Sequence, residues 1–480
     1  MQFRRRRSSV LDEISNEMLL FCVSWVILTL WSVQCQSIVD EYQWKEVQFA
    51  NLPLSTDAYI GPFPYFLPEN NDVLGSAYHA KSRTMFVAIS RLREGVPSTL
   101  NAFCADDYAP GSSPVLWAFP DYKTNTLHPE DFSQGARSVK EPPEEPVDEF
   151  RHKRPLGSYS QSNYRIISVY HPIVDNECDR LFILDTGIMR NTDDTTYFVQ
   201  RPALLVYDLS RYVCSSGNVQ LIKRVELPES VWKNSLGFDY PTADYQYKGT
   251  CDDLFVYMNN IFDNSIVVLD YAKNDFWMFA NHSSFVPVPS ESQVLDNYQL
   301  NYGTMNVEVG WPDKKGNKIA YYAPGASTAE YATTTKVLKN RRMTHTYGAE
   351  FRIVGYEGCK GSIHRQFFDK NCGVMFFAHM ASGQVTCWNV GKPFNPNNLG
   401  VILQTDPQEV FSEVYVDSEG YLWMHSCHIH QLLGSTEPLD LTQVNSRIRK
   451  FRVLDAIQGT VCDTFGQLPD EIAWEYFDEL

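Results

Sequence analysis

The sequence predicts an all-β protein, a six-bladed β-propeller, and three observations support this fold class. Short runs of aromatic and β-branched residues recur along the chain between Asp, Asn and Gly residues, which is a strand pattern. The runs form six pairs, and no long amphipathic helix separates the pairs. Several runs are apolar at every position, which indicates strands covered on both faces, as in sheets arrayed around an axis. The variable spacing leaves two stacked β-sandwiches as the alternative.

Each pair of runs is expected to mark one sheet of the propeller. The two runs of each pair begin, in chain order, at Met85 and Leu116, Leu181 and Leu204, Leu254 and Ile266, Ile319 and Phe351, Val374 and Val385, and Tyr421 and Lys450. Sheets arranged in a ring leave only short, protected edges, so six such modules can form one closed domain.

Composition excludes several classes of protein. The chain has 480 residues, a formal net charge of −17 and 44% hydrophobic residues. This apolar content supports a sizeable core and excludes a chain that is disordered throughout. The acidic balance disfavours a nucleic-acid partner, because DNA and RNA backbones are also negative.

The first 35 residues are interpreted as a secretory signal peptide. Arg4–Arg7 give a positive start, the run 18–33 is apolar and uncharged, and a cleavage point follows Cys35. Sixteen residues are short for a membrane span, which needs about 20. The acidic residues before the run leave two alternatives, a start at Met18 or an uncleaved signal anchor. The expected propeller then occupies residues 36–463, in the secretory pathway.

Two segments do not fit the strand pattern. Residues 133–162 are rich in charge and proline, with few apolar residues, and we expect a mobile surface insertion there. Residues 464–480 are expected to form an acidic C-terminal tail. The tail ends in Phe477-Asp-Glu-Leu480, which resembles an endoplasmic-reticulum retrieval signal except at its first residue. Secretion is the prediction, and retention in that lumen is the alternative.

The cysteine residues fit an oxidising compartment. Nine remain after Cys35, at wide and irregular spacing without a CxxC pair, so disulfides are expected rather than a zinc ribbon or a thioredoxin motif. An odd number leaves at least one thiol unpaired within the chain. The sequon Asn281-His282-Ser283 follows an apolar run, and secretion would make Asn281 a glycosylation site.

Local motifs do not identify a catalytic centre. The sequence lacks the G-x-S-x-G elbow, the P-loop, G-x-G-x-x-G and H-E-x-x-H. His79, His364 and His379 lie near predicted strands, where a structural histidine is more common than a catalytic one. The cluster from His425 to His430 holds four metal-ligand side chains, but one strand cannot present all four on one face. We therefore expect no metal site and no cofactor.

A set of motifs spread along the chain resembles the insect yellow / major royal jelly protein family. The motifs occur in family order and cover roughly residues 44–463. They are Trp44-Lys-Glu-Val, Asn70-Asn71 with Leu74-Gly75, Gly95-Val-Pro-Ser-Thr-Leu-Asn101, Cys178-Asp-Arg-Leu-Phe-Ile-Leu-Asp-Thr-Gly187, Arg201-Pro-Ala-Leu-Leu-Val-Tyr-Asp208, Cys251-Asp-Asp, Cys387-Trp388-Asn389 and Val461-Cys462-Asp463. The resemblance implies a secreted six-bladed β-propeller with a role in catecholamine and melanin chemistry of the cuticle, that is, in pigmentation.

The same resemblance implies disulfide pairings. Cys214 is expected to pair with Cys251 and Cys387 with Cys462. We also expect a Cys104–Cys178 bridge, although the family's usual partner of Cys178 lies later in the chain. Cys359 and Cys372 flank a predicted turn and could form a fourth bridge, which would leave Cys427 as the odd thiol.

Two functions follow from the resemblance, one of binding and one of catalysis. Some relatives bind biogenic amines and others convert dopachrome, so the predicted ligand is a small aromatic amine or a catechol-derived molecule in the propeller channel. Tyr321, Tyr322, Phe377 and His379 are the predicted ligand-binding residues, because aromatic faces suit a flat ring or an ammonium group. The family usually reads Trp-x-Leu-Ser-Asp-Arg where this chain has Trp423-Met-His-Ser-Cys-His428, so any function of that Asp-Arg pair is absent from this chain.

Overall fold

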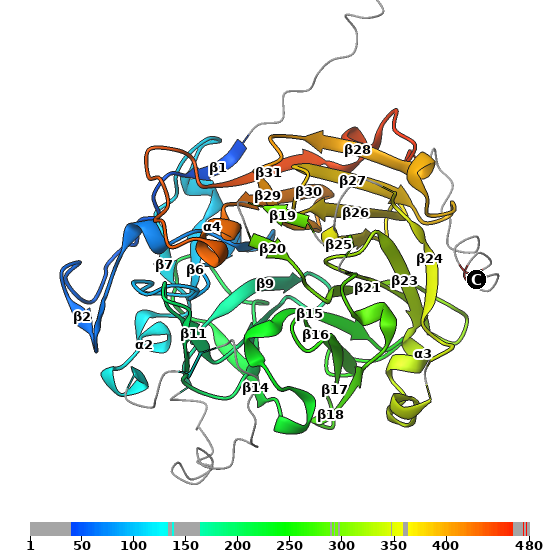
Figure 1. Ribbon diagram of the computed structural model, residues 1–480, viewed down its shortest axis with the longest axis horizontal. Helices are drawn as coiled ribbons and strands as arrows, with labels where there is room; N and C mark the ends of the chain where they lie inside the picture. Colours follow the sequence, from blue (N-terminus) through cyan, green and yellow to red (C-terminus); the bar gives the residue numbers. More distant parts are fainter. Residues whose placement is uncertain are drawn as a thin grey trace, which may run out of the picture. The chain divides into compact units, whose positions relative to one another are not determined.

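Six four-stranded antiparallel sheets follow one another around a common axis, which confirms the predicted six-bladed β-propeller (Figure 1). The computed structural model describes residues 40–132, 137–138, 164–288, 290–291, 293–295, 298–346, 348–358, 363–463, 474 and 477. The predicted signal peptide at 1–35 and nearly all of the predicted insertion at 133–162 lie outside the described residues.

The first three blades each run from an innermost strand at the axis outward. Blade 1 contains β4 (Gly75–His79), β5 (Thr84–Ala88), β6 (Leu100–Cys104) and β7 (Trp117–Ala118). Blade 2 contains β9 (Val169–Asp175), β10 (Arg180–Asp185), β13 (Ala203–Asp208) and β14 (Gln220–Glu226). Blade 3 contains β15 (Phe238–Tyr245), β16 (Leu254–Asn260), β17 (Ser265–Asp270) and β18 (Asp275–Ala280).

The second half of the ring repeats this order. Blade 4 contains β21 (Thr304–Pro312), β22 (Lys318–Pro324), β23 (Ala329–Thr334) and β24 (Arg352–Tyr356). Blade 5 contains β25 (Ile363–Asp369), β26 (Val374–His379), β27 (Gln384–Asn389) and β28 (Leu399–Gln404). Blade 6 contains β29 (Val410–Val416), β30 (Tyr421–Cys427), β31 (Ser446–Arg452) and, outermost, β1 (Asp40–Trp44) from the start of the described chain.

Short helices and additional strands lie in the loops between the blade strands. The helices are α2 (Tyr122–Asn125), α3 (Thr335–Leu338), α4 (Ile429–Gly434) and α5 (Val453–Ile457). The additional strands are β2 (Tyr59–Ile60) paired with β3 (Phe63–Pro64), β8 (Arg137–Ser138) with β12 (Thr195–Phe198) and β11 (Ile188–Arg190), and β19 (Gln293–Leu295) with β20 (Tyr298–Leu300).

Tight turns connect neighbouring strands within a blade. Asn264 and Asn274 stand in the turns that bound β17, with φ angles of 49° and 54°. Asparagine tolerates this left-handed conformation better than most residues, since its short polar side chain bonds locally. Such turns let each sheet proceed outward from the axis as a simple meander.

The ring is closed by pairing the beginning of the described chain with its end. In β1, Tyr42 stands opposite Ile448 and Trp44 opposite Ser446 of β31. The indole N–H of Trp44 donates to the carbonyl of Pro114 at 2.8 Å, and the ring is buried. Blade 6 is therefore built from both ends of the propeller, which prevents the sheets from separating at a free edge.

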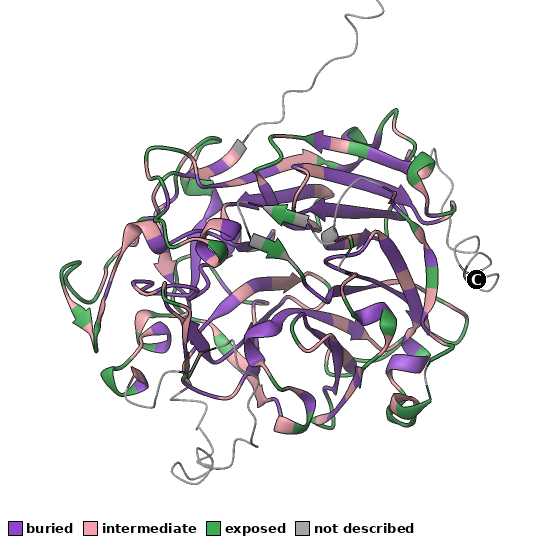
Figure 2. Ribbon diagram, in the orientation of Figure 1, coloured by how far each residue is buried: buried purple, intermediate pink, exposed green. Residues whose placement is uncertain are grey.

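The core consists of apolar layers between neighbouring blades. Figure 2 shows the blade strands mostly buried, with exposed residues in the peripheral loops and on β19 and β20 near the middle of the view. The described part of the C-terminal segment also packs against the core, because Trp474 and Phe477 contact the layer between blades 4 and 5. Phe477 is buried, and its carbonyl accepts a hydrogen bond from Arg352 Nη1 at 3.1 Å. The expected tail at 464–480 is thus anchored to the propeller at these two residues.

Candidate functional site

A buried group of charged side chains lies on the propeller axis. His171 of β9, Asp239 of β15, Glu308 of β21, Arg365 of β25 and Glu413 of β29 each project from the innermost strand of a different blade. We call these five residues the axial cluster. The innermost strand of each of these five blades therefore directs one charged or imidazole side chain toward the axis.

The ion pairs of the axial cluster cross the channel. Arg365 Nη2 lies 2.5 Å from Asp239 Oδ2, which joins blade 5 to blade 3. His171 Nδ1 lies 2.5 Å from Glu413 Oε2, which joins blade 2 to blade 6. The other ring nitrogen of His171 lies 3.3 Å from Asp239 Oδ1. Because the first two pairs connect blades that are not neighbours, the side chains must meet at the axis.

Glu308 is held beside this network by neutral donors. Asn306 Nδ2 donates to Glu308 Oε1 at 3.1 Å, and the backbone N–H of Phe368 donates to Oε2 at 3.4 Å. Arg365 Nη1 donates to the carbonyl of Met305 at 3.3 Å, from the same strand as Glu308. Blades 4 and 5 are therefore joined by polar contacts at the axis.

Blade 1 contributes a glycine rather than a charge. A Cβ atom on Gly75 would lie 2.8 Å from His171 Nδ1 and 2.4 Å from the carbonyl oxygen of Tyr170. Both distances are too short for any side chain, so Gly75 is needed for β4 to approach β9 this closely. The missing side chain gives His171 the space in which it reaches Glu413.

Burial sets the protonation of the axial cluster. Desolvation raises the pKa of Glu308 to about 8. Desolvation also raises the pKa of Glu413 well above its ordinary value, and the nearby charges of Asp239 and Glu308 add to this effect against that of Arg365. The pKa of Asp239 is raised by desolvation and opposed by Arg365. Burial thus favours the neutral form of all three carboxyl groups, and a cation that reached them would favour their ionisation.

An apolar group covers one end of the axial cluster. Its members come from the starts of innermost strands and from the loops that follow second strands. They are Leu74, Leu92, Ile261, Tyr302, Met305, Met380, Val410, Cys427, Ile429, Leu432 and Leu439, and we call them the mouth cluster. Met305 precedes Glu308 by three residues in β21, and Val410 precedes Glu413 by three in β29. At about 3.3 Å per residue, apolar and charged layers are adjacent along the axis.

The four residues predicted to bind a ligand are not brought together. Tyr321 and Phe377 pack in the layer between blades 4 and 5, whereas Tyr322 faces the layer between blades 3 and 4. His379 is buried, with Nε2 2.8 Å from Thr386 Oγ1 and Nδ1 3.7 Å from Glu357 Oε2. These side chains have packing roles between blades, and their role in ligand binding stays a prediction.

The other histidines are structural or lie outside the described side chains. His79 Nδ1 lies 2.7 Å from Ser82 Oγ, and its Nε2 lies 3.4 Å from Asp179 Oδ1 of blade 2. The side chain of His364 is not among those described. His425 in β30 is buried, and desolvation lowers its pKa to about 3. Within the described ranges, no group of three or more metal-ligand side chains has the geometry of a metal site.

The disulfides differ from two of the three expected pairings. The structure joins Cys104 to Cys214 and Cys178 to Cys251, so the predicted pairs Cys214–Cys251 and Cys104–Cys178 are wrong. Both observed bridges tie one blade to a loop of the next, a proximity that linear spacing does not reveal. The Cys387–Cys462 bridge is confirmed.

The remaining described cysteines are thiols. Cys372 and Cys427 are both free and buried, so Cys372 does not form the suggested bridge with Cys359. Cys359 lies outside the described residues.

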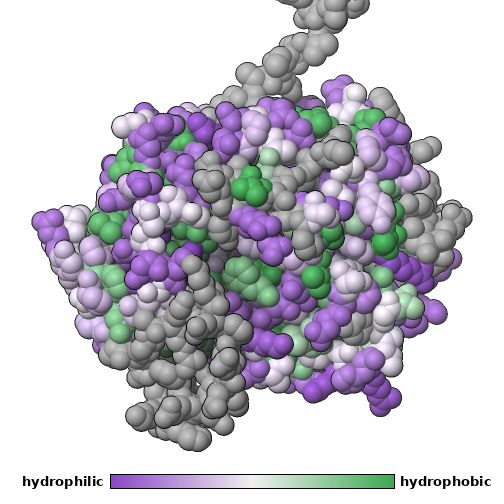
Figure 3. Space-filling model, viewed as in Figure 1, coloured by the Kyte–Doolittle hydropathy of each residue, from purple (hydrophilic) through white to green (hydrophobic). Residues whose placement is uncertain are grey.

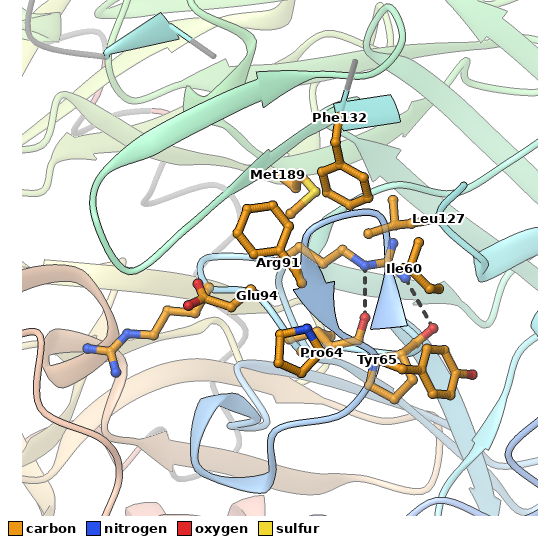
Figure 4. A pocket seen from close by; sticks show the side chains of 13 residues that line it. Ile60, Pro64, Tyr65, Arg91, Glu94, Leu127, Phe132 and Met189 are labelled. Carbon is orange, nitrogen blue, oxygen red and sulfur yellow. Dashed lines mark hydrogen bonds between the residues drawn. The ribbon is translucent and has the colours of Figure 1, made fainter. Parts of the chain in front are cut away.

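A narrow pocket lies on the same side of blades 1 and 2 as the loops after their second strands. Its walls include Ile60 and Pro64 of the β2–β3 hairpin together with Leu127, Phe132 and Met189 (Figure 4). Its cavity volume is about 20 Å³, which is room for a single water molecule.

The guanidinium group of Arg91, which lines this pocket, is already hydrogen-bonded to the protein. Arg91 Nε donates to the carbonyl of Val96 at 3.1 Å, and Nη2 donates to that of Pro97 at 3.2 Å. The guanidinium group therefore fixes the loop from β5 to β6. The pocket is a small gap in the packing between loops rather than a ligand site.

Comparison with known proteins decides the family. The major royal jelly protein family profile matches residues 167–462. The yellow-related salivary protein ASP4 of Phlebotomus orientalis is 30% identical over 457 residues, which cover 93% of this chain and 98% of that protein. The chain belongs to the major royal jelly protein family, which includes the yellow proteins.

Other comparisons accompany this family placement. L-dopachrome tautomerase yellow-f of Drosophila melanogaster is 24% identical to this family member, over 94% of this chain and 100% of the relative. A solved luciferin-regenerating enzyme has a TM-score of 0.41 and 12% identity, and covers 80% of this chain and 94% of its own. The profile and the yellow-related relatives confirm, at the level of the family, the resemblance seen in the motifs.

Further features of this major royal jelly family protein bear on its compartment. Three disulfides join cysteines in the described part of the chain, and such bridges are typical of chains that fold outside the cytosol. Asn281 follows β18 and is exposed, with a φ angle of 66°. Among the described residues, none of the helices has the length and apolar character needed to cross a membrane.

Sequence reasoning missed the axial cluster, although a signal for it exists. Each of its five residues lies on an innermost strand, eight to fifteen residues before one of the predicted runs. Polar residues interrupt these strands, so none of them forms an apolar run of the kind that marks the second strands. A charged or histidine residue at a similar distance before the first run of each of blades 2 to 6 is the signal that the sequence offers.

Proposed function

We propose that this protein binds a small aromatic amine or catechol-derived ligand at the mouth of the propeller channel, in the context of catecholamine and melanin chemistry. The observation that carries the proposal is that the apolar mouth cluster and the axial cluster follow one another along the same innermost strands, with Met305 and Val410 each three residues before an axial carboxyl group. An aromatic ring would replace contacts among the apolar side chains, and an ammonium group would approach Asp239 and Glu413.

The chemistry of both layers suits this class of ligand. Tyr302 offers an aromatic face in the mouth cluster, and Met305 and Met380 provide adaptable thioether side chains. An ammonium ion beside the axial carboxyl groups would favour their ionised form, so binding would release a proton and leave a carboxylate next to the ammonium ion. Entry requires displacement of mouth-cluster side chains such as Ile429 and Leu432 of the six-residue helix α4.

Titration calorimetry with dopamine and serotonin tests this proposal. Asp239→Asn and Glu413→Gln remove acidic charge at the axis and are expected to weaken binding at least tenfold, or about 1.4 kcal/mol. The matched control is Asp244→Asn, since Asp244 is also buried in β15 but pairs with Lys318 and Lys339 instead. No binding by the wild type at millimolar ligand would contradict the proposal, as would equal losses in all three variants.

A second candidate function is dopachrome conversion, as the name of the yellow-f relative suggests. The specific observation is His171, whose two ring nitrogens lie beside Asp239 and Glu413. An isomerisation needs one group to take a proton from a carbon and one to return a proton, and a histidine between two carboxyls can do both.

Turnover distinguishes the two functions. Loss of dopachrome absorbance is followed with wild-type protein, with His171→Gln and with a boiled control. An enzyme is expected to lose turnover in His171→Gln, whereas a binding protein gives no rate above the boiled control.

We also propose that the protein is secreted. The support is the apolar segment at 18–33, the three disulfides and the salivary relatives, whose names place them in saliva.

A further inference from the structure

A second cavity lies away from the axis, where blade 1 meets blade 2. Its walls come from the outer strand β7, from the chain that enters the propeller near Ala50, and from the connection between β13 and β14. Its volume is about 220 Å³. Apolar cavities of about 150 Å³ admit benzene, so this space accommodates an aromatic molecule. We call it the aromatic groove.

The floor of the aromatic groove consists of packed rings. Phe119 and Tyr212 are nearly buried and meet edge to face, with ring centroids 5.7 Å apart. Trp117 and Val219 are partly buried and pack at the end of the core between blades 1 and 2. A ring seated on this floor would continue the edge-to-face packing of that core, which favours aromatic partners.

The walls of the groove are fixed by covalent and polar contacts. The Cys104–Cys214 disulfide ties the end of β6 to the connection that carries Tyr212. Tyr122 Oη donates to the carbonyl of Ala50 at 2.7 Å, and the N–H of Ala50 donates to the carbonyl of Leu116 at 2.7 Å. A preformed site loses little entropy when a ligand binds, so the groove is suited to a small molecule.

The uncharged lining of the groove favours a neutral ligand. None of its lining residues is an Asp, Glu, Lys, Arg or His. Burial raises the pKa of Tyr212 to about 12, so its hydroxyl stays uncharged. A charged group seated on this floor would lose hydration without gaining a partner. At the rim, the exposed residues Asn51 and Ser215 can accept or donate a hydrogen bond.

We propose that the aromatic groove binds a neutral aromatic molecule with a single ring or two fused rings, whose polar substituent points toward Asn51 and Ser215. This site does not depend on the proposed channel function. It differs from the channel in ligand class, since the channel offers carboxyl groups to a cation and the groove offers none.

Titration calorimetry with indole tests the groove. Val219→Trp fills the space with a large side chain, and Trp117→Ala removes one aromatic wall. Both changes are expected to weaken indole binding at least tenfold. The matched control is Val401→Trp, at an exposed valine of β28 in blade 5, and it is expected to bind indole like the wild type. Thermal unfolding of each variant verifies that it is folded.

Two results would overturn this inference. One is no heat of binding for wild-type protein at millimolar indole, and the other is unchanged affinity in Val219→Trp. Titration of dopamine into Val219→Trp separates this question from the channel, because the groove variant is expected to keep the wild-type affinity for the amine.

Discussion

At the scale of single residues, the axial cluster buries four charged side chains and a histidine on the propeller axis. Burying a charge is unfavourable unless it is paired, and Arg365 and His171 pair with Asp239 and Glu413 across the channel. Glu308 has hydrogen-bond donors but no direct ion pair among the described residues. It is therefore the carboxyl whose ionisation should weigh most clearly on stability.

Glu308→Gln is expected to change how stability depends on pH. The pKa of Glu308 rises from 4.5 to about 8 on folding because of burial. A carboxyl group with a raised folded pKa stabilises fully below its unfolded pKa, and this contribution is lost as pH rises toward 8. Urea unfolding should show wild-type stability falling relative to the variant by up to about 1.4 kcal/mol per pH unit in this window.

The matched control for this measurement is Glu419→Gln, which changes an exposed carboxyl. Its free energy of unfolding should change with pH by the same amount as that of the wild type over this window. If the free energy of unfolding of Glu308→Gln also followed the wild type at every pH, Glu308 would ionise as readily in the folded protein as in the unfolded chain, which would contradict the prediction.

At the scale of elements, the sequence was most informative about strands that are buried on both faces. The six first runs correspond to β5, β10, β16, β22, β26 and β30, the second strand of every blade. Second strands are sandwiched between two other strands and between two blades, so they are continuously apolar. The innermost strands carry the axial charges and the glycine at Gly75, and no apolar run marks them.

The pairing of cysteines that are distant in the sequence was the hardest property to predict. Cys104 and Cys214 are 110 residues apart in sequence, and Cys178 and Cys251 are 73 apart. Their proximity follows from how the loops of neighbouring blades meet, which requires the ring to be assembled first. The four residues predicted to bind a ligand do not lie together for a related reason, since Tyr321 and Tyr322 point to opposite faces of one strand.

Non-reducing peptide mapping should recover the observed disulfides. We expect linked peptides for Cys104–Cys214, Cys178–Cys251 and Cys387–Cys462, with Cys427 alkylated only after unfolding because it is buried. A Cys214–Cys251 linkage would contradict the structure. Replacing Cys462 with serine should also lower stability by about 4 kcal/mol, as expected for a cross-link that spans 75 residues.

At the scale of the whole molecule, ring closure by β1 holds the propeller together. Trp44→Ala removes a buried indole and its hydrogen bond to Pro114, and should cost about 3–5 kcal/mol of unfolding free energy. Urea denaturation measures this loss. Gln43→Ala on the same strand changes only a partly exposed side chain, and is expected to cost less than about 1 kcal/mol. Similar losses in both variants would contradict a special role for Trp44.

Secretion and glycosylation are tested together by expression in cultured insect cells. We expect the protein in the medium, beginning after residue 35, with glycan on the exposed residue Asn281. Intact mass before and after enzymatic deglycosylation checks both expectations. A membrane-extracted product that begins at Met1 would contradict cleavage, and an unmodified mass at Asn281 would contradict glycosylation.

The surface of the molecule gives little indication of the ligand. Figure 3 shows hydrophilic and hydrophobic atoms mixed over the visible face, with some hydrophobic patches near its middle. The distinguishing chemistry lies beneath, where an apolar layer covers buried carboxyl groups. The proposed function therefore depends on whether a ligand reaches that buried boundary.

A crystal structure of the protein soaked with dopamine tests this claim most directly. The proposed function predicts the ammonium group within hydrogen-bonding distance of the carboxylate of Asp239 or Glu413, and the catechol ring among the side chains of the mouth cluster. Dopamine bound only at the aromatic groove or elsewhere on the surface, with the axial ion pairs unchanged, would contradict it.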